Sequence, residues 1–445
     1  MTLLLLSLLA LRLTLVVDLA SAAAVAAPAS LADISVPVAD VLRASGPGGG
    51  GRNAPVSFWC CSMVQGKRST LLFAQASVKQ KLADSRGAIT EGTVGITVLA
   101  RSTDGETWSN MTAVPWSVDP QRAITYPSQA VSTLSGAVVV ITTPGNDAHG
   151  YHPIGPNNTA LSFITKSTDG KCSRSDPGFI ESLESRSGAD GLTWEELRPI
   201  PGVLGAGENH GIALRKTNPH AGRLVMPRID DPFGGATNHS AVAFMLYSDD
   251  QGESWRKGEA LPLGWGEAAI AEMKNGSILW TSRLGPPYVC PGKPDQPVAP
   301  ACRHYPTPVL RGMARSDDGG ETIAETWLVE QDNVDGLLFG TCSSSLASDP
   351  RSGRVFWGHP GAWPPGNRTR SNYTVSSTAD GKRWTFVDVA FPGGAGYSDL
   401  MVLPSGNLGV AFQRTLYESG VEGGGYDIAY ASLKLAPQQR RANRK

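Results

Sequence analysis

A tyrosine near the C-terminal end of this 445-residue chain stands in a setting that could present its hydroxyl group for chemistry. Tyr397 lies in the stretch Ala395–Leu400, where small residues precede an apolar run. Read alone, the stretch predicts an aromatic side chain at the start of a strand, with its hydroxyl group in water. The histidines that could act as bases are interpreted as structural hydrogen-bonding residues, and they are His210, His239 and His304.

The composition excludes several classes of ligand. Charged residues make up 18% of the chain and the formal net charge is -1, so no general attraction to nucleic acid or to an anionic membrane is expected. An anionic ligand must therefore be held by a local cluster of arginines. No Cys/His spacing is typical of a zinc site, and the glycine-rich run at residues 46–51 has neither a strand before it nor a helix after it to form a phosphate loop.

The two ends of the chain predict a secreted protein. Residues 1–26 contain a leucine-rich run and an Ala-x-Ala sequence at Ala24–Ala26, as in a signal peptide, and no later segment is apolar for long enough to span a membrane. We expect a flexible segment at residues 27–52, a disordered basic tail at residues 437–445, and a location outside the cell or in the endomembrane lumen. Cys290 and Cys302 are the first candidates for a disulfide bond, although pairing cannot be deduced from sequence. Sequons for N-glycosylation occur at Asn110, Asn157, Asn238, Asn275, Asn367 and Asn372.

A short repeated motif predicts the fold. It appears as Ser102-Thr-Asp-Gly-Glu-Thr-Trp108, Ser248-Asp-Asp-Gln-Gly-Glu-Ser-Trp255 and Ser316-Asp-Asp-Gly-Gly-Glu-Thr322, with degenerate copies elsewhere, and its aspartates are Asp104, Asp190, Asp250, Asp318 and Asp380. Successive aspartates are 86, 60, 68 and 62 residues apart, about the length of a four-stranded unit with long loops. Aspartate caps the amides of a turn, glycine takes the positive φ and tryptophan packs between units, so these aspartates are turn caps rather than catalytic groups.

Short apolar or alternating segments lie between the motifs, and we expect strands there: 95–100, 137–142, 223–226, 241–247, 277–281, 355–357 and 408–412. Together with the repeat they predict an all-β chain, a six-bladed β-propeller of four-stranded antiparallel blades over residues 53–436. The motif resembles the Asp box (BNR repeat) of sialidases and of several unrelated propellers, so by itself it indicates fold rather than activity.

An ordered series of motifs resembles the sialidase (neuraminidase) family over roughly residues 95–432. It comprises Gly207-Glu-Asn-His-Gly-Ile-Ala-Leu214, Gly222-Arg-Leu-Val-Met-Pro227, Trp265-Gly-Glu267, Asn275-Gly-Ser-Ile-Leu-Trp-Thr-Ser-Arg283, Arg370-Ser-Asn372 and Ala-Gly-Tyr397-Ser-Asp-Leu. In this company Tyr397 aligns with the nucleophile of the family and Glu267 with the base that takes its proton. Arg283 and Arg370 match two of the three arginines that bind the substrate carboxylate, with Arg368 as the alternative to Arg370.

The N-terminal part departs from the family pattern. Where sialidases have Tyr-Arg-Ile-Pro, this chain reads Val56-Ser-Phe-Trp59, and the best substitute for the missing arginine is Arg52. Counting back from the first Asp box places Glu91 at the position of the acid/base, with Asp84 as the alternative. Gln413 stands where the family often has a glutamate that neutralises the first arginine.

The resemblance implies an exo-α-sialidase that hydrolyses terminal sialic acids by a retaining mechanism with a tyrosine nucleophile. Its partners would be sialylated glycans, and no cofactor or metal is implied. The alternative is a catalytically weakened, sialidase-like lectin that binds sialylated glycans, and a third hypothesis is a propeller that serves as a protein-interaction scaffold. The oligomeric state stays open.

Overall fold

The computed structural model describes residues 56–83, 89–109, 111–114, 128–143, 161–167, 194–204, 207–230, 242–284, 311–329, 342–362, 370–415 and 426–435. The predicted leader, the flexible segment, the basic tail, the Cys290–Cys302 pair and the Asp190 motif up to residue 193 lie outside these ranges. Cys61 takes part in a disulfide bond whose partner side chain is also outside them. The described residues contain no helix with the length and apolarity needed to cross a membrane.

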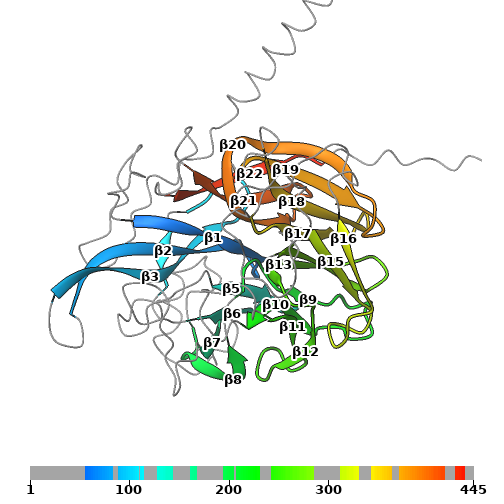
Figure 1. The fold of residues 1–445 in the computed structure, drawn as a ribbon, viewed down its shortest axis with the longest axis horizontal. Coiled ribbons are helices and arrows are strands. Elements are labelled where there is room, and N and C mark those ends of the chain that lie inside the picture. Colours follow the sequence, from blue (N-terminus) through cyan, green and yellow to red (C-terminus); the bar gives the residue numbers. More distant parts are fainter. Residues whose placement is uncertain are drawn as a thin grey trace, which may run out of the picture.

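The described part of the chain folds into antiparallel sheets (Figure 1). The first sheet contains β1 to β4, at Val56–Gln65, Thr70–Ala83, Ile89–Ser102 and Thr112–Ala113. The second contains β5 to β8, at Gln129–Ser132, Val138–Thr142, Leu161–Lys166 and Arg198–Leu204. The third contains β9 to β12, at Ile212–Ala213, Leu224–Asp230, Val242–Ser248 and Arg256–Ala260. The fourth contains β13 to β16, at Trp265–Glu272, Ile278–Leu284, Arg311–Ser316 and Glu325–Val329.

The remaining strands form two further blades that share one long strand. They are β17 to β22, at Ser345–Asp349, Arg354–Ala362, Arg370–Thr378, Thr385–Val402, Leu408–Thr415 and Tyr426–Leu433. The first part of β20 pairs with β19 as far as Gly394, whereas from Ala395 onward β20 pairs with β21. Strand β20 therefore crosses from the fifth blade into a sixth, which has three strands among the described residues. The predicted strand segments overlap β3, β6, β10, β11, β14, β18 and β21.

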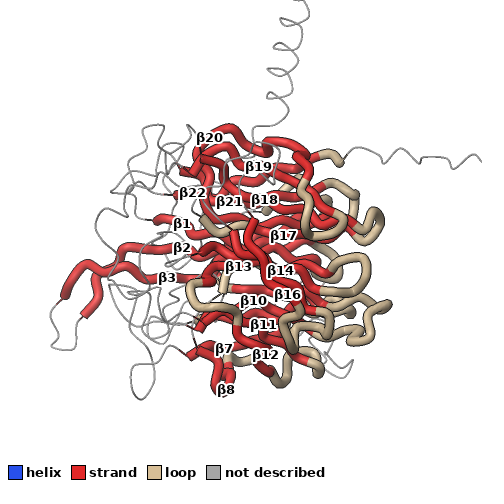
Figure 2. The backbone as a smooth tube through the Cα atoms, turned by 45° about the vertical axis from the view of Figure 1, so that its right-hand side comes forward, coloured by secondary structure: helices blue, strands red, loops and turns tan. Residues whose placement is uncertain are grey.

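The core closes into a ring with one apolar cluster at each boundary between blades. For example, Val225 and Met245 of the third blade pack with Trp280 of the fourth. Another cluster joins Met63 of the first blade to Ile428 of the sixth, which closes the circle. The other four boundaries have equivalent clusters. These contacts confirm an all-β propeller, and Figure 2 shows its described residues as strands joined by loops.

The Asp boxes form the turns that the sequence predicts. In one of them Ser316 Oγ donates to Asp318 Oδ1 at 2.9 Å, and Asp318 Oδ2 accepts from the Thr322 hydroxyl group. Gly320 has a φ of 96°, which only glycine adopts at low cost, and its amide donates to Ser316 Oγ. The tryptophan of another box, Trp384, packs on Trp357 of the same blade with ring centroids 4.9 Å apart, and both lie in the apolar cluster that the fifth blade shares with the fourth. The motif thus builds the turn and helps to join neighbouring blades.

Candidate active site

The innermost strand of each blade begins at the same end of the propeller, and this end is called the mouth here. Within a blade the second strand returns to the mouth and the third leaves it again, so Arg283 near the end of β14 lies at the mouth and is paired with Arg311 at the start of β15. The Asp box that follows β15 therefore lies at the opposite end. The turns that carry the repeat and the residues that could do chemistry are separated by the length of the strands.

Three of the predicted site residues meet at the mouth. Tyr397 Oη donates a hydrogen bond to Glu267 Oε1 at 2.7 Å. Arg283 Nη1 lies 2.8 Å from both carboxylate oxygens of the same glutamate. Glu267 and Tyr397 are 130 residues apart in sequence and belong to different blades. A phenol, a carboxylate and a guanidinium group therefore form one continuous hydrogen-bonded unit.

Irregularities in the inner strands place these side chains. The register of β13 against β14 shifts between Trp265 and Ala268, which is where Glu267 lies. The register of β20 against β21 shifts between Ala395 and Ser398, which is where Tyr397 lies. An extra residue in one strand bends it and re-aims the side chain at that point. The small residues around Tyr397 in the sequence therefore mark a bulge at the mouth.

The surroundings of Tyr397 keep its hydroxyl group protonated at rest. Burial and the negative charge of Glu267 raise the pKa of Tyr397 well above its usual value, and Glu208 adds to the effect. The Glu267 carboxylate in turn raises the pKa of Arg283, so this guanidinium group stays charged. The tyrosine is only 8% exposed, whereas the Arg283 side chain is 33% exposed and can meet a ligand. The arrangement suits a neutral nucleophile beside a fixed base and an anion-binding cation.

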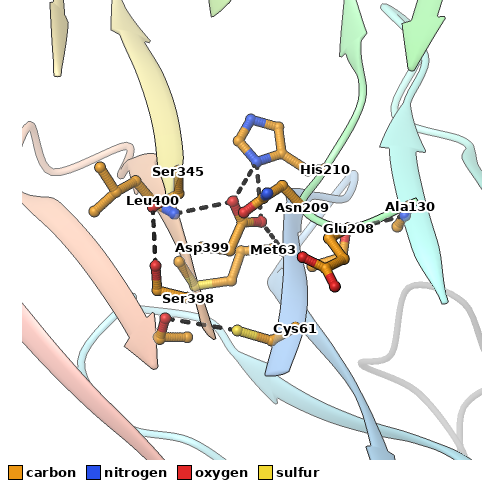
Figure 3. Close-up of polar contacts among 12 residues, drawn as sticks. Cys61, Met63, Ala130, Glu208, Asn209, His210, Ser345, Ser398, Asp399 and Leu400 are labelled. Carbon is orange, nitrogen blue, oxygen red and sulfur yellow. Dashed lines mark hydrogen bonds and ion pairs between the residues drawn. The ribbon is translucent and has the colours of Figure 1, made fainter. Parts of the chain in front are cut away.

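A second buried pair is formed by His210 and Asp399 (Figure 3). Nδ1 of His210 lies 2.8 Å from Asp399 Oδ1, and the same carboxylate accepts the amides of Met63 at 2.6 Å and Leu400 at 3.0 Å. Asp399 is fully buried and lies two residues after Tyr397. It thus ties the sixth blade to the first and to the turn before the third blade. His210 thus has the hydrogen-bonding role that its residue type predicts, and its partner Asp399 has no role predicted from the sequence.

The turn that carries His210 is itself fixed by buried amides. Asn209 adopts a left-handed conformation with a φ of 64°, and its Nδ2 donates to the carbonyl oxygens of Ala268 at 2.9 Å and Ser344 at 3.1 Å. Gln129 Nε2 donates to the carbonyl oxygen of Glu208 at 2.7 Å. Four blades therefore meet at this turn. The motif Gly207–Leu214 was noticed in the sequence as a family signature, and the structure shows its physical use.

The N-terminal corner of the mouth holds an aromatic side chain. Trp59 of β1 contacts the ring of Tyr397, with ring centroids 5.7 Å apart. Gln413, fully buried, donates through Nε2 to the carbonyl oxygen of Phe58 at 3.1 Å. The candidate arginine for this corner, Arg52, lies outside the described residues. Its assignment stays a prediction.

The other two predicted residues are placed by their backbones only. Arg370 begins β19, opposite Ala362, and its side chain is not among those described; Arg368 and Asp84 lie outside the described ranges. Glu91 pairs with Lys81 in the long β2–β3 hairpin. Trp59 of β1 pairs with Gln75 of β2, and Gln75 pairs with Thr97 of β3. Thr97 is six residues from Glu91, which is about 20 Å along the strand at ~3.3 Å per residue. In Figure 1 the outer ends of β2 and β3 extend away from the other blades.

No metal or cofactor enters this description. In the part of the chain that the structure describes, no group of three or more His, Cys, Asp and Glu side chains could hold a metal ion. The chemistry argued below uses the protein's own side chains.

Comparison with known proteins agrees with the propeller fold. No family model matches the chain. The sialidase of Micromonospora viridifaciens is 29% identical over 274 residues, which cover 59% of this chain and 36% of that protein. A sialidase of Vibrio cholerae is 26% identical over 226 residues, which cover 45% of this chain and 26% of that protein. The matches thus span well under half the length of these curated relatives.

Solved structures share the fold. The intramolecular trans-sialidase from Ruminococcus gnavus, solved in complex with oseltamivir carboxylate, superposes with a TM-score of 0.53 at 16% identity, covering 85% of this chain and 94% of that one. The fold is therefore the sialidase-like β-propeller. In sequence the chain is distantly similar to curated sialidases.

Proposed function

We propose that this protein is an exo-α-sialidase that removes terminal sialic acids from glycoproteins, glycolipids or oligosaccharides. The observation that carries the proposal is the hydrogen bond from Tyr397 Oη to Glu267 Oε1 at 2.7 Å, beside the Arg283 guanidinium group. Sialic acid bears a carboxylate on its anomeric carbon, which would repel a carboxylate nucleophile. A neutral phenol with a carboxylate base avoids this repulsion.

In the first step, Glu267 takes the proton of Tyr397 as Tyr397 Oη forms a bond to the anomeric carbon. The bond from that carbon to the leaving oxygen breaks, and the leaving oxygen receives a proton from an acid, for which Glu91 is the predicted residue. In the second step, water attacks the anomeric carbon and gives a proton to the carboxylate left by the acid, while the bond to Tyr397 Oη breaks and the phenolate takes its proton back from Glu267. Two inversions retain the configuration.

Arg283 would bind the substrate carboxylate while it holds Glu267. A guanidinium group presents several N–H donors in one plane, so it can contact two carboxylates at the same time. Arg370 and Arg52 are the proposed partners in this role. Support for a carboxylated ligand comes from the Ruminococcus gnavus relative, which was solved with oseltamivir carboxylate.

The test is release of 4-methylumbelliferone from its α-sialoside by the purified protein and by Tyr397→Phe. We expect turnover by the wild-type protein and a loss of about 10²-fold or more in the variant, with an unchanged melting temperature. Analysis of the sugar products by NMR then separates hydrolysis from transfer within the sugar. Full activity of Tyr397→Phe would refute the tyrosine mechanism.

A lectin that binds sialylated glycans without cleaving them is the second candidate. This candidate is favoured by the position of Glu91, the predicted acid, whose backbone lies about 20 Å along β3 from Thr97, the residue in line with Trp59. Binding of sialyllactose with no release of sialic acid would decide for it. Secretion also remains a proposal, supported by the predicted leader and sequons. A shift in mass on treatment with an N-glycosidase would test it.

A further inference from the structure

Trp59 forms an aromatic wall beside the candidate nucleophile. Its indole ring contacts the ring of Tyr397 at a tilt of 50°, and the residue is still 38% exposed. Trp59 lies where β1 shifts register against β2, between Trp59 and Ser62. Strand β1 is the third inner strand with a register shift at the mouth, after β13, which carries Glu267, and β20, which carries Tyr397. The bulge gives Trp59 an orientation that the regular strand would not.

The opposite side of the tyrosine is packed. Cys61, Met63 and Cys342 lie in the same buried cluster as Tyr397. Tyr397 is thus part of the apolar core, while its aromatic neighbour Trp59 is 38% exposed. A partly exposed tryptophan in this place offers its remaining surface to whatever occupies the mouth.

The polar contact to β1 at this corner comes from an uncharged side chain, and Arg414 lies next to it in the sequence, opposite Ala395 of β20. Gln413 reaches the backbone of β1 at Phe58 with an amide group. The carboxylates and the guanidinium group that act on the pKa of Tyr397 are those of Glu267, Glu208 and Arg283, in the fourth blade or the turn before the third, and the Cys342 thiol before the fifth blade adds to them. The first blade therefore contributes apolar surface to the mouth, and the other side contributes charge. A sugar ring with a carboxylate on one side and C–H groups on its face matches such a division.

We propose that Trp59 is a specificity-determining residue that packs its indole ring against the apolar face of the bound sugar. The inference rests on the proposed function, because Trp59 would bind the uncharged part of the same ligand in the same site. Flat aromatic surfaces contribute binding through contact area and a favourable face geometry. Arg283 selects the carboxylate of the ligand, and Trp59 selects the apolar face of the sugar ring beside it.

The experiment measures binding of N-acetylneuraminic acid and of its uncharged C1 methyl ester by calorimetry. The variants are Trp59→Phe and Trp59→Leu, since both cover Tyr397 but only phenylalanine offers a flat face. We expect Trp59→Leu to weaken both ligands by about 5- to 10-fold, corresponding to ~1–1.4 kcal/mol. Trp59→Phe should stay within about threefold of wild type. Phe386→Ala, which removes an aromatic side chain of similar exposure from the first part of β20, should change neither ligand.

The outcomes separate the inference from the proposed function. If the wild-type protein binds neither ligand, the proposed function fails, and the inference fails with it. If the wild-type protein binds and Trp59→Leu binds both ligands equally well, the inference alone is overturned. A loss confined to the acid would also overturn it, because that loss would mean an effect on the charged groups rather than on the ring.

Discussion

Asp399 and His210 form a buried pair across the propeller, with Asp399 Oδ1 lying 2.8 Å from His210 Nδ1. The carboxylate only accepts, so Nδ1 of the histidine carries the proton. Burial opposes the charged imidazolium, but the charge and hydrogen bond of Asp399 outweigh it and raise the pKa of His210 above 6.5. The pair joins the strand of the candidate nucleophile to the turn before the third blade. Its protonation is therefore linked to the stability of the mouth.

This linkage predicts a loss of stability at alkaline pH. A raised pKa means that the folded protein binds the proton more tightly than the unfolded chain. The stabilisation is fully present below about 6.5, the unfolded value, and is lost as pH rises through the pKa of the folded state. His210→Gln, which can still donate to Asp399, should flatten this part of the curve of melting temperature against pH. His220→Gln, at the opposite end of the third blade, is the control. Parallel curves for wild type and His210→Gln would contradict the prediction.

Glu267 is predicted to be required for turnover rather than for folding. In Glu267→Gln the side chain keeps its size and can still meet Tyr397, but it no longer takes a proton readily. We expect kcat to fall by about 10²- to 10⁴-fold, with little change in the urea midpoint of unfolding. The control is Glu253→Gln, whose carboxylate is about half exposed and bonds Lys166 and Arg198 at the surface. An unaffected kcat in Glu267→Gln would remove the assignment of this residue as the base.

Arg283→Lys should lower affinity for the substrate more than it lowers the rate of the bound complex. One Arg283 nitrogen contacts both oxygens of Glu267, and the rest of the planar group is available for a second carboxylate. Lysine concentrates its charge at a single nitrogen and cannot reproduce both contacts. We expect KM for the sialoside to rise about tenfold or more, with a smaller change in kcat. Arg315→Lys, a variant of a similarly exposed arginine near the end of β15 remote from the mouth, should have normal kinetics.

Asp318→Ala is predicted to destabilise the propeller without changing the chemistry at the mouth. The carboxylate accepts the Ser316 and Thr322 hydroxyl groups and the amides of Glu321 and Thr322. These hydrogen bonds to the charged form outweigh burial and lower the pKa of Asp318. We expect a loss of ~1–3 kcal/mol in the free energy of unfolding, measured by urea denaturation, with KM unchanged.

The neighbouring substitution Asp317→Ala is the matched control. It removes only the exposed ion pair with Arg315 and should cost less than about 1 kcal/mol. Equal losses of stability in the two variants would show that the box hydrogen bonds contribute little.

Much of the fold could be predicted from sequence because its determinants are local. An Asp box uses residues within seven or eight positions of one another, and the hydrogen bonds of its aspartate side chain are made inside the turn, as Ser248, Asp250 and Ser254 illustrate. The spacing of such turns then gives the size of a blade. The strand shared by the fifth and sixth blades was not predicted, because the change of partner at Ala395 depends on which strand lies beside it.

The candidate site could be predicted only in part. Tyr397, Glu267 and Arg283 were found through the order of their motifs, and the structure brings these three together. Asp399 lies in the same stretch, and its motif assigns it no role. Residues two positions apart in a strand share a face, so alternation along β20 could have placed Asp399 on the face of Tyr397. Trp59 could not have been found, since its neighbour in space is more than 300 residues away in sequence.

The sequence by itself determined the repeat, the type of turn that each box forms, and the identities of the phenol, carboxylate and guanidinium groups. These depend on short spacings and on residue chemistry, which the chain carries before it folds. Only the tertiary structure decided that Asp399 bonds His210 and that Trp59, not an arginine among the described residues, lies against Tyr397. Both contacts join blades that become neighbours, or face each other across the axis, only when the ring closes. Ring closure is a property of all the blade boundaries together, so no single stretch of sequence contains it.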